Sequence, residues 1–171
     1  MKGLFKAGLV LLACALSPMP GAVAQPAGQQ CASENSLGTQ TLRCGGGITI
    51  VAENGARYTL QGSRKDRIDA VELDGKALLI EVAPKSDGSK FRVITPQAIA
   101  AVRGTKWVVD VSEGKTSVFV VNGRVGVGRR TSSHVVTLGA GDGVDVQLLG
   151  PLTVKRWPPA RVSALMARLG Q

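Results

Sequence analysis

Histidine, cysteine and aromatic residues are scarce in this chain of 171 residues, and each scarcity excludes a class of site. Cys14 lies in a segment that we expect to be removed on export. His134 and the two remaining cysteines then fall short of the four ligands of a structural zinc site. Aromatic residues make up only 4% of the chain, too few for a row of base-stacking platforms. We therefore expect no metal site and no nucleic-acid interface.

The first 24 residues have the layout of an export signal. Lys2 and Lys6 precede an apolar run, and Ala22-Val23-Ala24 supplies the small residues that signal peptidase requires before Gln25. The apolar run is about half of the roughly 20 residues that span a bilayer. We therefore expect cleavage between Ala24 and Gln25, a periplasmic or secreted product, and no transmembrane span in the mature chain.

A second processing site overlaps this signal. Leu11-Leu12-Ala13-Cys14 resembles a lipobox, in which Cys14 would be the acylated residue. The segments before it would be unusually short, and the site at Ala24 fits the rules for signal peptides better. Lipidation at Cys14 stays open as the alternative.

Cys31 and Cys44 remain after cleavage, in a compartment where disulfides persist. An even pair in an exported chain predicts one bridge, and two free buried thiols are the alternative. Removing Lys2 and Lys6 leaves 19 basic and 12 acidic side chains, a net charge of +7. The basic residues are scattered, which is typical of a solvated surface. An anionic polysaccharide or acidic lipid headgroups would be their counterparts outside the cytoplasm.

Short β-rich runs alternate with turn dipeptides from residue 48 onward. Asn-Gly and Asp-Gly are favoured two-residue hairpin turns because both positions tolerate positive φ. The pairs are Asn54-Gly55, Asp74-Gly75, Asp87-Gly88 and Asn122-Gly123. The pattern predicts an all-β domain: a compact antiparallel roll or sandwich, or a solenoid-like stack of short strands.

The C-terminal tail departs from this pattern. Val162, Leu165, Met166 and Leu169 follow helical spacing after Pro158-Pro159 and form one apolar stripe, flanked by Arg161 and Arg168. A helix this short is marginal alone, so the stripe must dock. We expect it to pack on the β-domain, and docking on a partner or membrane is the alternative. The predicted divisions are a signal peptide at 1–24, a leader with the Cys31–Cys44 loop at 25–47, a β-domain at 48–148 and the tail at 149–171.

Motifs for catalysis and for ligand binding are incomplete. Gly114-Lys115-Thr116 ends like a phosphate-binding loop but lacks the earlier glycine, and its position between two strands predicts a hairpin turn. The acidic residues Asp66, Asp69, Glu72 and Asp74 do not have calcium-loop spacing. His134 and either Asp142 or Asp145 could supply the base and the acid of a Ser/His/acid triad, but the sequence has no nucleophile-elbow pattern beside them. We expect no enzyme activity and no cofactor.

One segment carries a more specific pattern. An apolar strand from Phe91 ends at Thr95-Pro96, and Val102-Arg103-Gly104-Thr105 then leads into the run 107–111. Gly123-Arg124-Val125 and Leu138-Gly139-Ala140-Gly141 follow in order. Pro96 must interrupt the ladder, and Gly104 suits a conformation that other residues avoid. Arg103 should satisfy turn carbonyls or an acidic partner.

Together these residues resemble the FecR domain, the periplasmic module of ferric-citrate-type regulators, over residues 48–146. The resemblance implies a non-enzymatic module for protein interaction or sensing in cell-envelope signalling, with an envelope protein as partner. Regulators of this family carry an anti-sigma-type segment and a membrane helix before this domain. This sequence shows neither, so direct control of a sigma factor is unsupported. The alternatives are a basic module that binds cell wall or polysaccharide, and a hydrolase built around His134.

Overall fold

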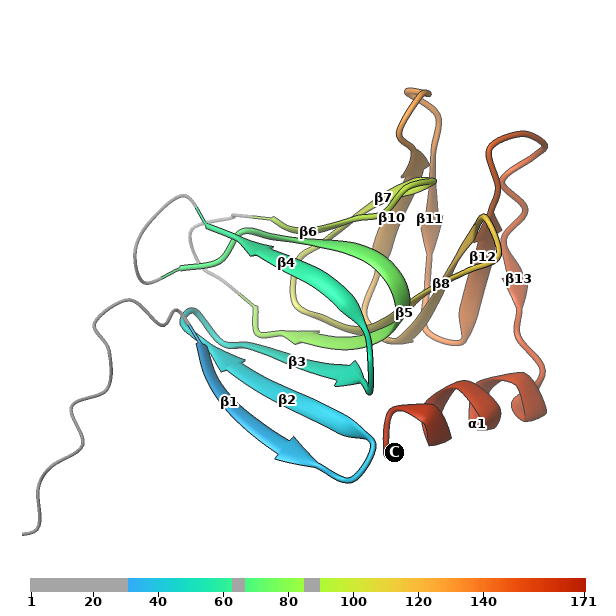
Figure 1. Ribbon diagram of the computed structural model, residues 1–171. Helices are drawn as coiled ribbons and strands as arrows, with labels where there is room; N and C mark the ends of the chain where they lie inside the picture. The colour runs from blue at the N-terminus through green and yellow to red at the C-terminus, as the bar shows by residue number, and fades with distance from the viewer. Residues whose placement is uncertain (1–30, 63–66, 85–89) are drawn as a thin grey trace, which may run out of the picture.

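The computed structural model describes residues 31–62, 67–84 and 90–171. The predicted export signal, Cys14, the cleavage site at Ala24 and Gln25, and the turn at Asp87-Gly88 lie outside these residues. The described chain forms thirteen strands and one helix (Figure 1). Their bounds are β1 (Cys31–Ser36), β2 (Thr39–Cys44), β3 (Ile48–Glu53), β4 (Arg57–Gln61), β5 (Ala70–Val82), β6 (Phe91–Ile94), β7 (Ala98–Val102), β8 (Thr105–Ser112), β9 (Lys115–Asn122), β10 (Val125–Arg129), β11 (Val135–Leu138), β12 (Asp142–Val146), β13 (Lys155–Arg156) and α1 (Pro159–Arg168). The predicted all-β class with one short C-terminal helix is confirmed.

The sheet is organised around β5, which bends so that its two halves belong to different layers (Figure 1). Its first half pairs with β4 and β6, and its second half pairs with β3 and β8. The first layer continues through β7, β10 and β11, and the second through β9, β12 and β13 on one side and β2 and β1 on the other. The strands pair antiparallel, as predicted, except that β5 and β6 run parallel.

The hairpin predicted at Asp74-Gly75 is wrong, because β5 runs through this dipeptide without reversing. Arg57 pairs with Gly75 while Tyr58 pairs with Leu73, so Asp74 is an extra, bulged residue. Lys76, with φ of 66°, follows the bulge. An extra residue on one strand increases its local bend and twist. The dipeptide therefore turns β5 from one layer into the other.

Two Asn-Gly turns also differ from the predicted hairpins. Asn54-Gly55 links β3 to β4, and Asn122-Gly123 links β9 to β10, but the linked strands do not pair with each other. They lie in opposite layers, so each dipeptide forms a corner between the layers. The chain does reverse sharply at both sites, but pairing to β5, β7 and β8 determines where the strands go. The turn at Ser112 to Lys115 is a hairpin, as predicted, because these two residues pair directly.

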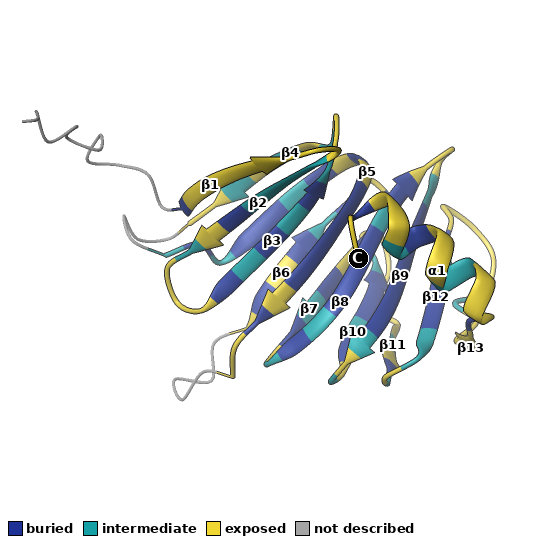
Figure 2. Cartoon of the chain, turned by 90° about the horizontal axis from the view of Figure 1, so that it is seen from below, coloured by how far each residue is buried: buried dark blue, intermediate teal, exposed yellow. Residues whose placement is uncertain are grey.

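The main core lies between the two layers (Figure 2), where inward residues of alternate positions meet. Trp107 on β8 is fully buried at its centre. The strand β9 contributes Val118 and Val120 to this core and Phe119 to a second one on the outer face. It is therefore covered on both faces, as its continuous apolar run predicts.

The second core lies between the layer that contains β8 and β9 and the helix α1 (Figure 2). Leu165 and Leu169 are buried there, with Val162 and Met166 packed against the same cluster. Pro159 occupies the first helical turn, where its missing N–H is not needed. The expectation that the apolar stripe packs on the β-domain is confirmed.

Cys31 and Cys44 are joined by a disulfide, as predicted. They face each other at the open end of the hairpin formed by β1 and β2. The hairpin pairs with β3 through β2, so residues 31–44 belong to the sheet. The regular β-structure therefore begins before residue 48, where the sequence places the start of the β-domain.

Candidate functional site

The Thr95-Pro96 pair forms the turn between β6 and β7. The Thr95 hydroxyl accepts a hydrogen bond from the Ala98 amide at 2.9 Å. It also lies 2.7 Å from the hydroxyl of Thr116, which donates to Gln97 Oε1 at 2.8 Å. Thr95, Gln97 and Thr116 are all buried. This turn is a satisfied polar cluster inside the domain, and its role is structural.

The second part of the pattern, Val102 to Thr105, connects β7 to β8. Gly104 has φ of 62°, a conformation that suits glycine, and a side chain there would meet Pro84 at 3.0 Å. The Thr105 hydroxyl donates to the carbonyl of Arg124 at 3.1 Å, which ties this turn to the corner before β10. Two turns far apart in the sequence thus meet, and each carries an exposed arginine, Arg103 and Arg124.

These arginines lie at a groove on the outer face of β7, β10 and β11, with a volume of about 520 Å³. Gly126 and Gly128 point outward from β10, so this strand has no side chains between its neighbours. Across the strands, Gly128 pairs with Ile99 on one side and Val135 on the other. Both side chains are exposed, at 37% and 59%. The groove therefore follows β10, with apolar walls on β7 and β11.

The charged residues around the groove are all basic. Lys90, Arg103, Arg124 and Arg129 line it, and no acidic residue does so in the part of the chain that the structure describes. Arg129 donates from Nε to the carbonyl of Gln147 at 2.8 Å and from Nη2 to that of Gly150. These carbonyl acceptors orient the guanidinium without neutralising it. The site combines apolar walls with a positive rim.

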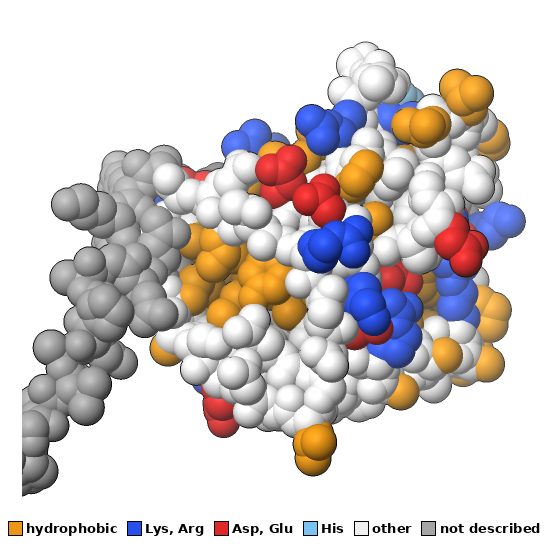
Figure 3. Space-filling model, viewed as in Figure 1, with side chains coloured by type: hydrophobic (Ala, Val, Ile, Leu, Met, Phe, Trp, Pro, Cys, Tyr) orange, Lys and Arg blue, Asp and Glu red, His pale blue; other side chains and the backbone are white. Residues whose placement is uncertain are grey.

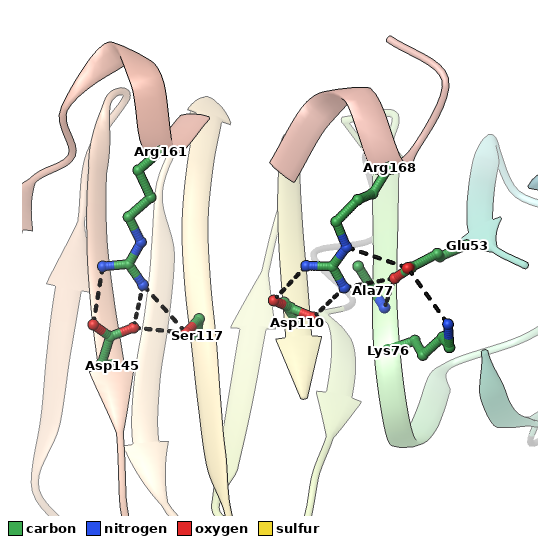
Figure 4. Close-up of polar contacts among 8 residues, drawn as sticks. All are labelled: Glu53, Lys76, Ala77, Asp110, Ser117, Asp145, Arg161 and Arg168. Carbon is green, nitrogen blue, oxygen red and sulfur yellow. Dashed lines mark hydrogen bonds and ion pairs between the residues drawn. The ribbon is translucent and has the colours of Figure 1, made fainter. Parts of the chain in front are cut away.

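A different cluster anchors α1 to the second layer (Figure 4). Arg161 donates to both oxygens of Asp145 at 2.5 and 3.0 Å, and Ser117 donates to the same carboxylate at 2.6 Å. The Arg161 guanidinium also lies 3.4 Å from the centre of the Trp157 ring, which stacks on Phe119. Burial would raise the pKa of Asp145, but hydrogen bonds from Arg161 and Ser117 and the charges of Arg161 and Lys115 hold it below its ordinary value.

Arg168 forms the second anchor, to Glu53 and Asp110 (Figure 4). Burial would raise the pKa of Glu53, but the hydrogen bond and charge of Arg168, the Ala77 amide and Lys76 lower it overall. The hydrogen bonds to Asp110 and Glu53 raise the pKa of Arg168. In both anchors the arginine is matched by carboxylates. They hold the helix and leave no charge for a ligand.

The residues considered for catalysis are not assembled into a triad. His134 is exposed on the loop between β10 and β11. Asp145 binds Arg161, while Asp142 accepts from the Gly139 amide at 3.0 Å and pairs with Arg156. Each carboxylate thus serves a neighbouring arginine.

Two of the acidic residues considered for calcium interact with neighbouring side chains instead. Asp66 lies outside the described residues. Asp69 pairs with Arg67 at 2.9 Å, and Glu72 accepts from Gln61. Across residues 31–62, 67–84 and 90–171, no three His, Cys, Asp or Glu side chains gather as metal ligands. Over the same residues, no helix has the length and apolar character needed to cross a bilayer.

A second hollow, of about 470 Å³, lies at the tip of the β1–β2 hairpin and the corner after β3. Its lining is mostly neutral and polar, with Glu53 as the charged residue. Figure 3 also shows hydrophobic side chains in the opening between the two layers, on the side of β3 and β4. Neither feature joins apolar walls to charges of one sign, as the groove along β10 does.

Sequence reasoning found the turns that bound the groove but missed the groove itself. Gly126 and Gly128 are visible signals, because glycine inside a strand marks a bend or a close approach. At Gly128 a side chain would meet the carbonyl of His134 at 3.1 Å, which is such an approach. The walls come from β7 and β11, and their register beside β10 cannot be read from composition.

Comparison with known proteins supports the pattern in the sequence. The model of the family described as FecR protein matches residues 38–126, just over half of the chain. That segment contains both signature turns and ends at the second residue of β10.

Two crystal structures of a candidate anti-sigma factor from Parabacteroides distasonis share the fold. The identities are 22% and 21%, with TM-scores of 0.52 and 0.51. Each match covers 81% of this chain and 61% of the other, so the chain spans about three fifths of those proteins. The comparison with curated proteins found no match. On the family match, the chain belongs to the FecR protein family.

Proposed function

We propose that this protein is an exported, non-enzymatic FecR-type module that acts through protein contacts in cell-envelope signalling. The observation that carries the proposal is the position of the Val102–Thr105 turn, which the family pattern singles out. It leads Arg103 to the rim of an open groove. Open surfaces with an apolar centre and a polar rim are suited to protein recognition.

The chemistry of the groove and the rest of the described surface favour binding over catalysis. A catalytic site needs a nucleophile or base held by a second polar group. In this fold the buried hydroxyls of Thr95 and Thr116 hydrogen-bond to each other at a turn. The carboxylates near α1 accept hydrogen bonds from arginines. The export signal predicted at 1–24 supports a periplasmic or secreted location.

Affinity capture with the mature protein tests this proposal. The protein purified from the periplasm, carrying a tag after Gln171, serves as bait in detergent-solubilised envelope extract with a chemical cross-linker. Mass spectrometry should recover one envelope protein with cross-links near the groove, for example at Lys90. Heat-denatured bait is the control. Recovery of the same proteins by native and denatured bait contradicts the proposal.

A module that binds anionic polysaccharide is the second candidate, favoured by the four basic residues around the groove. It predicts that the protein sediments with an anionic cell-wall polymer and that salt reverses the binding steeply, because exposed charges are screened. Cosedimentation at low and physiological salt separates the two candidates. A protein partner whose recovery changes little with salt supports the first.

A further inference from the structure

The groove along β10 binds an acidic, extended peptide segment with an apolar side chain at its centre; we propose this as the contact through which the module meets its partner. The inference rests on the proposed function only for the claim that the natural occupant is a protein. Its physical basis is the shape and charge of the groove itself.

The direction of the groove requires an elongated occupant. It follows β10, where neither glycine carries a side chain: Gly126 lies between Ala101 and Thr137, and Gly128, which is buried, lies between Ile99 and Val135. A volume of about 520 Å³ is in the range of cavities that bury ligands. Outward residues on one strand repeat at every second position, so successive hollows are spaced for the side chains of an extended chain.

Three of the four basic residues gather at one end of the groove. Val102 pairs with Phe91 and with Val125, so Lys90, Arg103 and Arg124 lie beside one another. Arg124 precedes β10 and Arg129 ends it, five residues apart. At about 3.3 Å per residue, the two backbone positions are separated by roughly 16 Å. An extended segment of five or six residues spans this length, with an acidic end beside Lys90, Arg103 and Arg124. The guanidinium of Arg129, at the other end of β10, is held by the carbonyls of Gln147 and Gly150.

The centre of the groove favours an apolar side chain in the middle of the bound segment. Ile99 and Val135 are exposed apolar walls, and the floor between them has no side chain. An aliphatic side chain placed there would bury its own surface and that of both walls, at about 25 cal/mol per Å². An anionic polysaccharide chain supplies negative charge but has no aliphatic side chain to place between these walls. The groove therefore fits a peptide better.

The probe is a fluorescein-labelled peptide with the sequence Ser-Glu-Asp-Leu-Ile-Asp-Glu-Ser, and anisotropy with the mature protein measures its binding. A peptide with lysine at every acidic position should bind at least about tenfold more weakly, because it meets like charges. Amide NMR shifts of the protein should change at Ala101, Gly126 and Val135 on addition of the acidic peptide. No binding of the acidic peptide, or equal binding of both peptides, overturns the inference.

Gly126 offers a variant that blocks the floor with little disturbance of the fold. A Cβ at this position would lie 3.5 Å from Val135 Cγ1, an ordinary contact, and the residue does not have positive φ. Gly126→Val should therefore fold and weaken the peptide at least about tenfold. Arg124→Glu should do the same by reversing one end charge. Arg43→Glu, an exposed arginine on β2 in the other layer, is the matched control and should change affinity less than about twofold.

Two outcomes would show that the groove does not recognise a peptide specifically. If Arg43→Glu weakens the peptide as much as Arg124→Glu, binding is non-specific attraction to a basic surface. If vesicles of phosphatidylglycerol bind and depend on Gly126 and Arg124 while the peptide does not bind, the occupant is a membrane surface. Both outcomes overturn the inference. Melting curves of all three variants verify that each is folded.

The proposed function and this inference fail separately. A captured envelope partner that still binds the Gly126→Val variant would leave the function standing and remove the groove from the contact. A groove that binds the peptide while capture yields no protein partner would support the site and contradict the function.

Discussion

Arg168, in the last turn of α1, holds Glu53, at the end of β3, across 115 residues of sequence. Its Nη2 donates to Glu53 Oε2 at 2.6 Å and its Nε to Oε1 at 3.2 Å. The same guanidinium donates to Asp110 on β8 at 2.9 and 3.0 Å. One side chain thus connects the C-terminal helix to two strands of the second layer. Forked contacts of this kind are favourable for arginine because its donors are fixed in a plane.

Replacement of Arg168 by methionine should lower the free energy of unfolding by about 1–2 kcal/mol. The change keeps an apolar stem but leaves two carboxylates without their cation. The loss should be smaller than the 3–5 kcal/mol of a fully buried pair, because the Arg168 side chain is 39% exposed. Urea denaturation monitored by tryptophan fluorescence measures it. Arg43→Met is the control, and equal midpoints for the two variants would contradict the assigned anchor.

Stability should fall as the pH is lowered into the acid range. The pKa of Glu53 and that of Asp145 are both lowered in the folded protein. The unfolded chain therefore binds more protons between the folded and unfolded pKa values, and stability rises with pH in that interval. The contribution is complete above the ordinary pKa values of about 4 and is lost as the pH falls through the folded values.

Melting temperatures of the wild type and Asp145→Asn between pH 3 and 7 test this linkage. The variant cannot titrate at this position, so its melting temperature should depend less on pH below about 4. It should also be less stable at pH 7, because Arg161 loses a charged acceptor. An identical pH dependence for both proteins would show that Asp145 does not contribute.

Leu165→Asp should lower the melting temperature of the isolated protein. Leu165 is 7% exposed in the core between α1 and the sheet. The change removes about 1.5–3 kcal/mol of apolar burial and places a charge in an apolar site. Ser163→Asp is the control for the charge itself, because Ser163 lies two residues before Leu165 and is exposed. A melting temperature that is unchanged for Leu165→Asp would mean that the helix does not stabilise the domain.

The disulfide between Cys31 and Cys44 should be complete in the exported protein. Thiol labelling after denaturation without reductant should find no reactive cysteine. Replacing both by serine should cost up to about 3 kcal/mol in the chain-entropy estimate for so short a loop. Two labelled thiols in the exported wild type would contradict the bridge.

The mature chain should begin at Gln25. Intact-mass measurement of the exported protein tests this directly, since cleavage after Ala24 predicts one mass for residues 25–171. A lipidated species that begins at Cys14, or a product that retains Met1, would overturn it.

Local features of the sequence were enough to predict the all-β class, the C-terminal helix and the disulfide. Helical spacing of Val162, Leu165, Met166 and Leu169 predicts α1 and its buried face, and both are found. The cysteine pair predicts the bridge. The ordered turns of the FecR pattern predict the family, and the family match includes them. These inferences succeed because they depend on neighbours in the chain or on a pair of residues with one plausible partner.

The order of the residues alone is thus enough to predict an all-β chain with a bridged pair of cysteines and a docked C-terminal helix. The folded sheet is needed to show that Asp74 is a bulge in a continuous strand, that two Asn-Gly turns are corners, and that Arg168 binds Glu53 and Asp110. The fold also places Gly126 between Ala101 and Thr137, and Gly128 between Ile99 and Val135, along the groove. The reason is physical: turn residues favour a local φ, whereas the partner of each strand is selected by burial of side chains across the whole sheet.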